Sequence, residues 1–342
     1  MSRFRLLAVS SLVVVLAAGC AIDLGTLGGD FSQAADINDR GVVVGYAFTA
    51  ANEQHAYRQA PGRRKVDLNG DFVRSDAVAV NRSGVTVGYA YEHDDGIERA
   101  VLWDRAGVAH DLGAGDGSRA TDINDDGVVV GNITTLAVAQ LGWVWDPAVG
   151  EIEMLPHAYP GGEEFQQAEG INNDGTIVGT EDEPGSGAGS GSVFWVGPDH
   201  RPVGLAGLGA TYSNAFDIND RGDIVGVING DHSQRAIVWL APAYEPLDIT
   251  PPGAPYGTAF GINDRRKVVG LVSEINSEWT FRWDARNGQF VDLGGLGGSN
   301  ARAVAINEQG VAVGWATTGD VTSTGYPISH ATAFIPRPGH SP

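Results

Sequence analysis

The chain contains 342 residues, of which 42 are acidic and 22 are Lys or Arg, so its formal net charge at neutral pH is −20. A negative charge of this size excludes nucleic acid as a partner, because binding to the phosphate backbone requires clustered basic residues. Cys20 is the only cysteine. No intramolecular disulfide can form, so the stability of the protein must come from a packed core.

Residues 1–19 are typical of a bacterial export signal. Arg3 and Arg5 precede an apolar stretch that is too short to span a bilayer. The segment Leu16–Cys20 resembles a lipobox, in which the cysteine is acylated and the chain is cut just before it. We therefore expect an exported protein that lipid on Cys20 anchors to the membrane, at the outer membrane or the cell surface. The alternative is a secretory signal peptide that ends beside a cysteine by coincidence.

Removal of residues 1–19 would leave 20 basic and 42 acidic residues, a net charge of −22. This charge disfavours docking on anionic lipid, so the acyl chains must supply the anchoring. The simple interpretation of the charge is solubility, and the other is attraction of cations or of a basic partner.

Seven segments share one pattern, in which an Ala precedes an Asn by four residues and a Gly follows it by seven. The first segment is ADINDRGVVVG at residues 35–45, and the last is VAINEQGVAVG at residues 304–314. The spacing between successive Asn residues is 43 to 48. Such self-similarity is the signature of a repeat protein. The seven residues are Asn38, Asn81, Asn124, Asn172, Asn219, Asn263 and Asn307.

Each unit contains four short apolar runs separated by turn residues, which favours strands over helices. Asn-x-x-Gly predicts a type I turn followed by a left-handed residue that closes a hairpin, so the seven Asn residues are structural turn residues. The sixth unit has Arg266 in place of that Gly, so we expect its hairpin to be reshaped. The acidic residues around these turns are out of register with a calcium-binding loop. The Trp residues of the third run are expected to pack between units: Trp103, Trp145, Trp195, Trp239 and Trp283.

The segments Asp23–Gly29 and Asp292–Gly298 read DLGTLGG and DLGGLGG, and His55–Tyr57 reads HAY. Together with the repeated Asn and Gly, they resemble the extracellular HAF repeat. The chain departs from that pattern where units four and five lack the Asp-Leu pair, and where Arg99 or Arg235 replaces the His. The resemblance implies an exported repeat protein without a defined biochemical role, and it supplies no catalytic residues.

Units of this length with four short strands are typical of β-propeller blades. We predict an all-β, seven-bladed β-propeller of four-stranded antiparallel blades over residues 20–336, with a C-terminal tail at 337–342 and a monomeric state. The last unit lacks a fourth strand, and residues 22–25 supply a spare one. The N-terminal strand should therefore close the ring as the outer strand of the blade built from residues 293–335. An open β-solenoid is the alternative, but it would require capping units.

The sequence contains no nucleophile–base spacing, zinc-type histidine pair or glycosidase motif, so it indicates no catalytic residue, metal or cofactor. Asp36, Asp122 and Asp217 either converge on a cation near the axis or bond turn amides. The sequence favours a lipid-anchored, non-catalytic binding scaffold for a cell-envelope protein or glycan. The alternative is a propeller enzyme, a lyase or hydrolase that acts on envelope or environmental polysaccharide.

The predicted ring has two unlike faces. The Asn-x-x-Gly turns share one face with the tight turns between third and fourth strands, whereas the connections on the other face are long and dissimilar. Variable loops on a rigid scaffold are where recognition usually takes place, although plain solvated connectors are an alternative. The candidate binding residues on this long-loop face are Glu92, His93, Asp94, Asp95, Glu181, Asp182, Glu183, Asp231 and His232.

Overall fold

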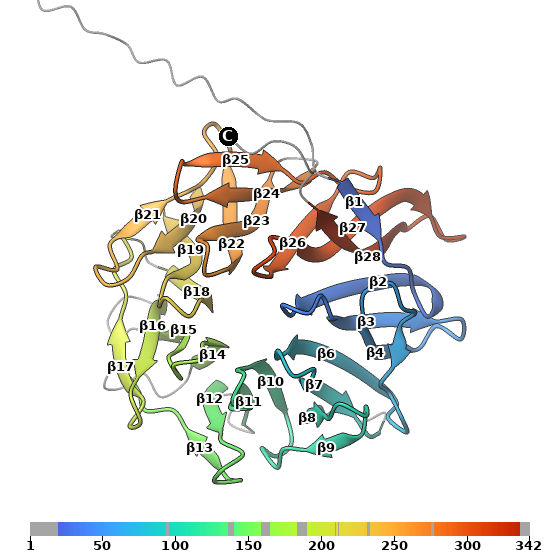
Figure 1. Cartoon of the computed structure of the whole chain (residues 1–342), viewed down its shortest axis with the longest axis horizontal. Helices are drawn as coiled ribbons and strands as arrows, with labels where there is room; N and C mark the ends of the chain where they lie inside the picture. The colour runs from blue at the N-terminus through green and yellow to red at the C-terminus, as the bar shows by residue number, and fades with distance from the viewer. Residues whose placement is uncertain are drawn as a thin grey trace, which may run out of the picture.

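The computed structural model describes residues 20–93, 96–135, 140–158, 165–182, 190–208, 210, 212–230, 233–274 and 277–335. The described chain forms 28 strands arranged as a ring of four-stranded antiparallel blades around an open centre (Figure 1), and a single parallel bridge between Gln234 and Tyr256 joins two of the blades into one sheet. The predicted all-β, seven-bladed β-propeller is therefore confirmed. The described residues include no helix that is long and apolar enough to cross a membrane.

Six blades run outward from the axis in chain order. Blade 1 comprises β2 (Gly28–Ile37), β3 (Val43–Thr49), β4 (Gln54–Gln59) and β5 (Val66–Asp67), and blade 2 comprises β6 (Arg74–Val80), β7 (Thr86–Tyr91), β8 (Arg99–Trp103) and β9 (Ala109–Asp111). Blade 3 comprises β10 (Ser118–Ile123), β11 (Val129–Thr134), β12 (Gln140–Trp145) and β13 (Ile152–Met154), and blade 4 comprises β14 (Gln166–Ile171), β15 (Ile177–Asp182), β16 (Ser190–Val196) and β17 (Arg201–Gly204). Blade 5 comprises β18 (Tyr212–Ile218), β19 (Ile224–Gly230), β20 (Ser233–Trp239) and β21 (Pro246–Asp248), and blade 6 comprises β22 (Tyr256–Ile262), β23 (Lys267–Ser273), β24 (Glu278–Asp284) and β25 (Gln289–Asp292).

Blade 7 is built from both ends of the chain. Its strands are β26 (Ala301–Ile306), β27 (Ala312–Val321), β28 (Pro327–Ile335) and, outermost, β1 (Cys20–Asp23). Figure 1 shows β1 in blue beside the red β28. The predicted closure is confirmed with two corrections: the closing strand covers residues 20–23 rather than 22–25, and the blade begins at Ala301 rather than at residue 293. The open solenoid is excluded.

Every blade has the same irregularity in its first strand. In blade 1 the pairing with β3 skips one residue between Ala34 and Asp36, and the other six blades repeat this β-bulge. The bulge brings the first strand very close to the repeated Gly of the second strand. A Cβ added at Gly45 would overlap the carbonyl oxygen of Gln33, and the equivalent Gly of each blade has the same close neighbour. The Gly that follows each repeated Asn by seven residues is therefore required, because any side chain there would collide with the backbone of the first strand.

The core lies between blades. Trp103, Trp195 and Trp239 are completely buried there, as predicted. Blade 3 differs, because Trp143 is completely buried and Trp145 is only partly buried. Trp143 is paired with Gly131 and occupies the space where a Cβ at Gly131 would lie. Every blade has this glycine, so the difference lies in its partner, which is Val101 in blade 2, Val193 in blade 4 and Trp143 in blade 3.

The Asn-x-x-Gly turns form as predicted. The Oδ1 atom of each Asn accepts the amide four residues on, and the amide at the fourth turn position bonds the carbonyl of the Asn. The prediction of a reshaped hairpin at Arg266 was wrong. Arg266 adopts the left-handed conformation with φ of 57° and keeps the turn bond to Asn263, of length 2.9 Å. Two bonds from its guanidinium to the buried Asp223 carboxylate, of 2.8 and 2.9 Å, offset the backbone strain.

Candidate functional site

A closed ring of hydrogen bonds surrounds the axis on the face that carries the Asn turns. The Nδ2 atom of each repeated Asn donates to the carbonyl oxygen of the Asn in the next blade. The seven bonds are 2.9 to 3.3 Å long, and the last runs from Asn307 back to Asn38. An aspartate has no hydrogen to donate here, so the ring explains why all seven positions are amides. The sequence analysis missed this second role of the Asn side chain.

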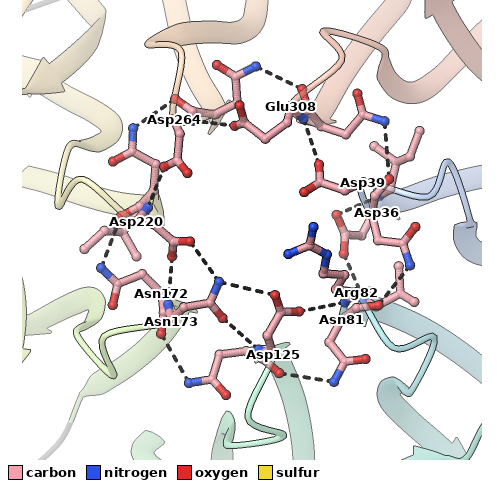
Figure 2. Close-up of a pocket in the computed structure, with 18 of the residues that line it drawn as sticks. Asp36, Asp39, Asn81, Arg82, Asp125, Asn172, Asn173, Asp220, Asp264 and Glu308 are labelled. Atoms are coloured by element: carbon pink, nitrogen blue, oxygen red, sulfur yellow. Dashed lines mark hydrogen bonds between the residues drawn. The ribbon is translucent and has the colours of Figure 1, made fainter.

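The residues that follow each Asn form a second, more exposed ring. Figure 2 shows them around an open centre, a cavity of about 210 Å³. The backbone amide of each ring residue donates to the side-chain oxygen of the ring residue in the next blade, at six of the seven positions. In order around the ring the residues are Arg82, Asp125, Asn173, Asp220, Asp264, Glu308 and Asp39. Arg82 has no acceptor atom, so the series cannot continue from Asp39 to Arg82. Burial, and secondarily the charge of neighbouring carboxylates such as Asp264, raises the pKa of Glu308.

Asp36, Asp122 and Asp217 interact electrostatically, because the pKa of Asp122 is raised first by burial and then by the charges of Asp36 and Asp217. One oxygen of each carboxylate accepts the amide of the following residue, and the other accepts an amide of the next blade; for Asp36 these donors are Ile37 and Val80. Burial raises the pKa values to about 6, 8 and 7, respectively. The carboxylate oxygens therefore bond amides, as one of the two interpretations predicted. The described residues contain no group of three or more His, Cys, Asp or Glu arranged to hold a metal ion.

The long-loop candidates do not form one cluster in the described structure. Glu92 pairs with Arg99 at 2.6 Å, His93 is exposed and Asp182 is partly buried. Asp94, Asp95, Glu183, Asp231 and His232 lie outside the described residues. Cys20, the predicted lipidation site, is exposed on the outermost strand of blade 7.

Glu181 differs from the other candidates because it is completely buried. Its Oε1 lies 2.9 Å from Nδ1 of His157, and its Oε2 accepts the amide of Ala158 at 2.8 Å. The His157 side chain is 31% exposed, so the imidazole stands between the buried carboxylate and solvent. The other imidazole nitrogen, Nε2, has no partner among the described residues. This arrangement fixes the ring and leaves one nitrogen open to a substrate or a water molecule.

Hydrogen bonds anchor the described part of the loop that carries His157, residues 155–158. The carbonyl oxygen of Pro156 accepts Nε1 of the buried Trp195 at 2.8 Å and Nε2 of the buried Gln166 at 3.3 Å. A preorganised histidine needs no reordering when it meets a substrate. Blade 4 thus supplies the carboxylate and the anchoring side chains, and the connection between blades 3 and 4 supplies the histidine of this His–Glu pair.

Glu181 also departs from the repeat. The equivalent second-strand positions in the other six blades are all apolar: Ala47, Ala90, Ile133, Ile228, Val272 and Ala316. A buried acid where the repeat requires an apolar residue is costly for folding, so it is a candidate for function. Comparison of the repeats could have identified Glu181, but nothing in the sequence connects it with His157. A carboxylate that orients a histidine through Nδ1 while Nε2 stays open is the arrangement used for proton transfer in hydrolases.

The chain matches no protein-family model, and no curated protein resembles it detectably in sequence. Solved structures do resemble it. TolB from Acinetobacter baumannii aligns with a TM-score of 0.54 at 11% identity, over 77% of this chain and 64% of that one. A Mycobacterium tuberculosis puromycin-hydrolyzing peptidase aligns with a TM-score of 0.56 at 12% identity, over 85% and 48%. The Pyrococcus horikoshii acylaminoacyl peptidase aligns with a TM-score of 0.55 at 13% identity, over 92% and 53%.

At these identities the likeness is one of fold, and the chain spans only 48 to 64% of the length of these three proteins. The non-catalytic scaffold expected from the sequence was nevertheless wrong as the leading interpretation. Two of the three structures described above are peptidases, and they favour the hydrolase alternative over the non-catalytic one. The expectation rested on polar residues that looked scattered along the loops. The fold brings two of them, 24 residues apart, into direct contact.

Proposed function

We propose that this propeller belongs to a hydrolase that cleaves peptide or acyl-amide bonds, and that His157, oriented by Glu181, transfers the proton. The observation that carries the proposal is the 2.9 Å contact between the partly exposed imidazole of His157 and the buried carboxylate of Glu181, which stands at a position that is apolar in the other six blades. Two of the similar structures are peptidases, which favours an amide substrate over a polysaccharide.

The proposed chemistry uses Nε2 of His157. The nitrogen accepts a proton from a water molecule, and the water oxygen attacks the carbonyl carbon of the substrate. The imidazolium then donates the proton to the departing amine, so the C–N bond breaks and the imidazole returns to its neutral form. Glu181 stabilises the imidazolium and keeps Nδ1 protonated throughout.

The test compares wild-type protein with His157→Gln and Glu181→Gln on a defined peptide mixture, with products identified by mass spectrometry. We expect cleavage by the wild type and a loss of about 100-fold or more in kcat/KM for His157→Gln. His110→Gln is the matched control, because His110 is exposed and only touches Asp104 at 3.7 Å. The proposal fails if the wild type cleaves no peptide, or if His157→Gln cleaves as well as the control.

We also propose, from the sequence, that the protein is exported and held at the membrane by lipid on Cys20. In this arrangement the long-loop face and His157 meet substrates outside the cell membrane. Cys20 is exposed and opposite Ile335, which leaves the thiol accessible for acylation.

A further inference from the structure

A groove of about 410 Å³ lies between blades 1 and 2 on the face that carries the Asn turns. Its volume falls within the range of small-ligand sites, which is about 300–1,000 Å³. Blade 1 supplies most of its lining, and blade 2 supplies one wall through Ser83, Gly84 and Arg105. This groove is separate from the His157 site, which lies on the long-loop face, where the connection between blades 3 and 4 meets blade 4.

Four arginines line the groove: Arg58, Arg63, Arg64 and Arg105. Arg63, Arg64 and Arg105 are exposed. Within the described part of the chain, none of their guanidinium groups pairs with a carboxylate or makes a side-chain hydrogen bond. Acids outnumber bases by 42 to 22 in this protein, so three adjacent unpaired arginines stand out against the overall charge. Repulsion among them is unfavourable unless an anion joins them.

The two walls of the groove are built on rigid turns. Arg58 donates from Nη1 to the carbonyls of Gly84 and Asp104, at 2.9 and 3.0 Å, and from Nη2 to the carbonyl of Arg105 at 2.8 Å. These bonds pin the blade 2 turns against blade 1. Its guanidinium is therefore engaged with backbone, whereas the guanidinium of Arg105 is left at the rim of the groove.

Asp104 directly precedes Arg105 in the chain, and turn amides bond one of its two carboxylate oxygens, while the other lies 3.7 Å from Nε2 of His110. The Oδ1 atom of Asp104 accepts the amides of Ala106 and Val108 at 2.8 and 2.9 Å. On the opposite wall the amide of Arg63 bonds the carbonyl of Ala60, and its own carbonyl accepts Nε2 of Gln59, both at 3.0 Å. The backbone positions of Arg63 and Arg105 are thus fixed on both sides of the groove.

We infer that this groove binds an oxyanion-bearing ligand, a carboxylate or a phosphate, between Arg105 on one wall and Arg63 and Arg64 on the other. The planar guanidinium group carries a fork of donors that matches the two oxygens of either anion. Val42 and Val66 line the groove beside the arginines, and Val66 is 53% exposed. The site therefore suits a small ligand that has an apolar part next to its acidic group.

The experiment measures binding of inorganic phosphate and of citrate to the whole protein by isothermal titration calorimetry at constant ionic strength. We compare the wild type with Arg63→Ala/Arg105→Ala, which removes one guanidinium from each wall. The matched control is Arg40→Ala/Arg201→Ala, which removes the same charge from exposed arginines that do not line the groove.

We expect saturable binding of at least one anion, and about tenfold or greater weakening in the groove variant, because each lost charged hydrogen bond weakens binding by at least that factor. The control variant should bind as the wild type does. Binding of phosphate alone assigns a phosphate ligand, and binding of citrate alone assigns a carboxylate ligand. The inference is overturned if neither anion binds at millimolar concentration, or if both double variants weaken binding equally. These outcomes do not depend on peptide cleavage at His157.

Discussion

Nδ1 of His330, on the last strand, lies 2.7 Å from a carboxylate oxygen of Asp23, on the first strand. The pair joins the two ends of the described chain across β28 and β1. His55 and Asp67 make the same contact in blade 1, also at 2.7 Å. In both blades a histidine of the third strand therefore pairs with an aspartate of the fourth strand, and the pair in blade 7 spans the ring closure.

We expect Asp23→Asn to lower the free energy of unfolding by about 0.5 kcal/mol, as for other partly exposed ion pairs. Deletion of residues 20–23 should lower it by roughly 3 kcal/mol, because it also removes the β1–β28 hydrogen bonds and exposes an edge strand. Thermal melting of both variants checks this. Deletion of residues 337–342 is the control, and a deletion of 20–23 that melts like this control contradicts the role of β1.

A substitution at Arg266 compares two effects on stability: the backbone strain of its left-handed conformation and its ion pair with Asp223. Arg266→Gly should gain about 1 kcal/mol from relief of the backbone strain. It should lose about 3 kcal/mol because Asp223, which is completely buried, loses its guanidinium partner. Chemical denaturation should therefore show net destabilisation. Adding Asp223→Ala should recover part of the loss, and a stabilised single variant would contradict this account.

The three axial carboxylates predict a pH dependence of stability. Folding raises the pKa values of Asp36, Asp122 and Asp217 to about 6, 8 and 7, above their ordinary value of 3.8. The folded state therefore binds more protons than the unfolded state between about pH 4 and pH 8. The free energy of unfolding should decrease as the pH rises through this window.

Replacement of all three by Ala, the residue of blades 2 and 7 at Ala79 and Ala305, should flatten that slope even if absolute stability falls. Urea titrations at several pH values give the comparison. Equal slopes in the wild type and the triple variant would show that other groups cause the pH dependence.

Glu181 predicts a trade-off between stability and activity. Glu181→Ile introduces the residue of two other blades, Ile133 and Ile228, at a buried position. We expect the free energy of unfolding to change by less than about 1 kcal/mol, because apolar packing replaces a buried charge. Peptide cleavage should be lost. A large drop in melting temperature would instead assign Glu181 a purely structural role.

Cys20→Ser should release the protein from the membrane fraction, because a stable lipid anchor requires acyl chains on that sulfur. Fractionation of cells that express the wild type and the variant measures this. Retention of the variant in the membrane pellet, as for the wild type, would contradict lipid anchoring at Cys20.

Periodicity in the sequence was sufficient to predict the blades, because the repeated Asn and Gly are determined by local turn and bulge geometry. It was insufficient at Arg266, because the compensating partner Asp223 belongs to the neighbouring blade. The candidate site was harder still. Glu181 was selected only as one of several loop acids, and His157 was not selected at all. Their contact depends on the conformation of the loop between blades 3 and 4, which the repeat pattern does not predict.

The closure of the ring has a consequence for the order of folding. Synthesis begins at the N-terminus, so β1 is made first, whereas its partner β28 is the last strand to be made. Until then the four residues of β1 have no strand to pair with, and blades 1 to 6 can form only an open arc, whose two ends expose the apolar faces that blade 7 covers in the closed ring. Such ends invite association with other chains. We therefore expect nascent or truncated chains to need protection from aggregation until residues 327–335 arrive.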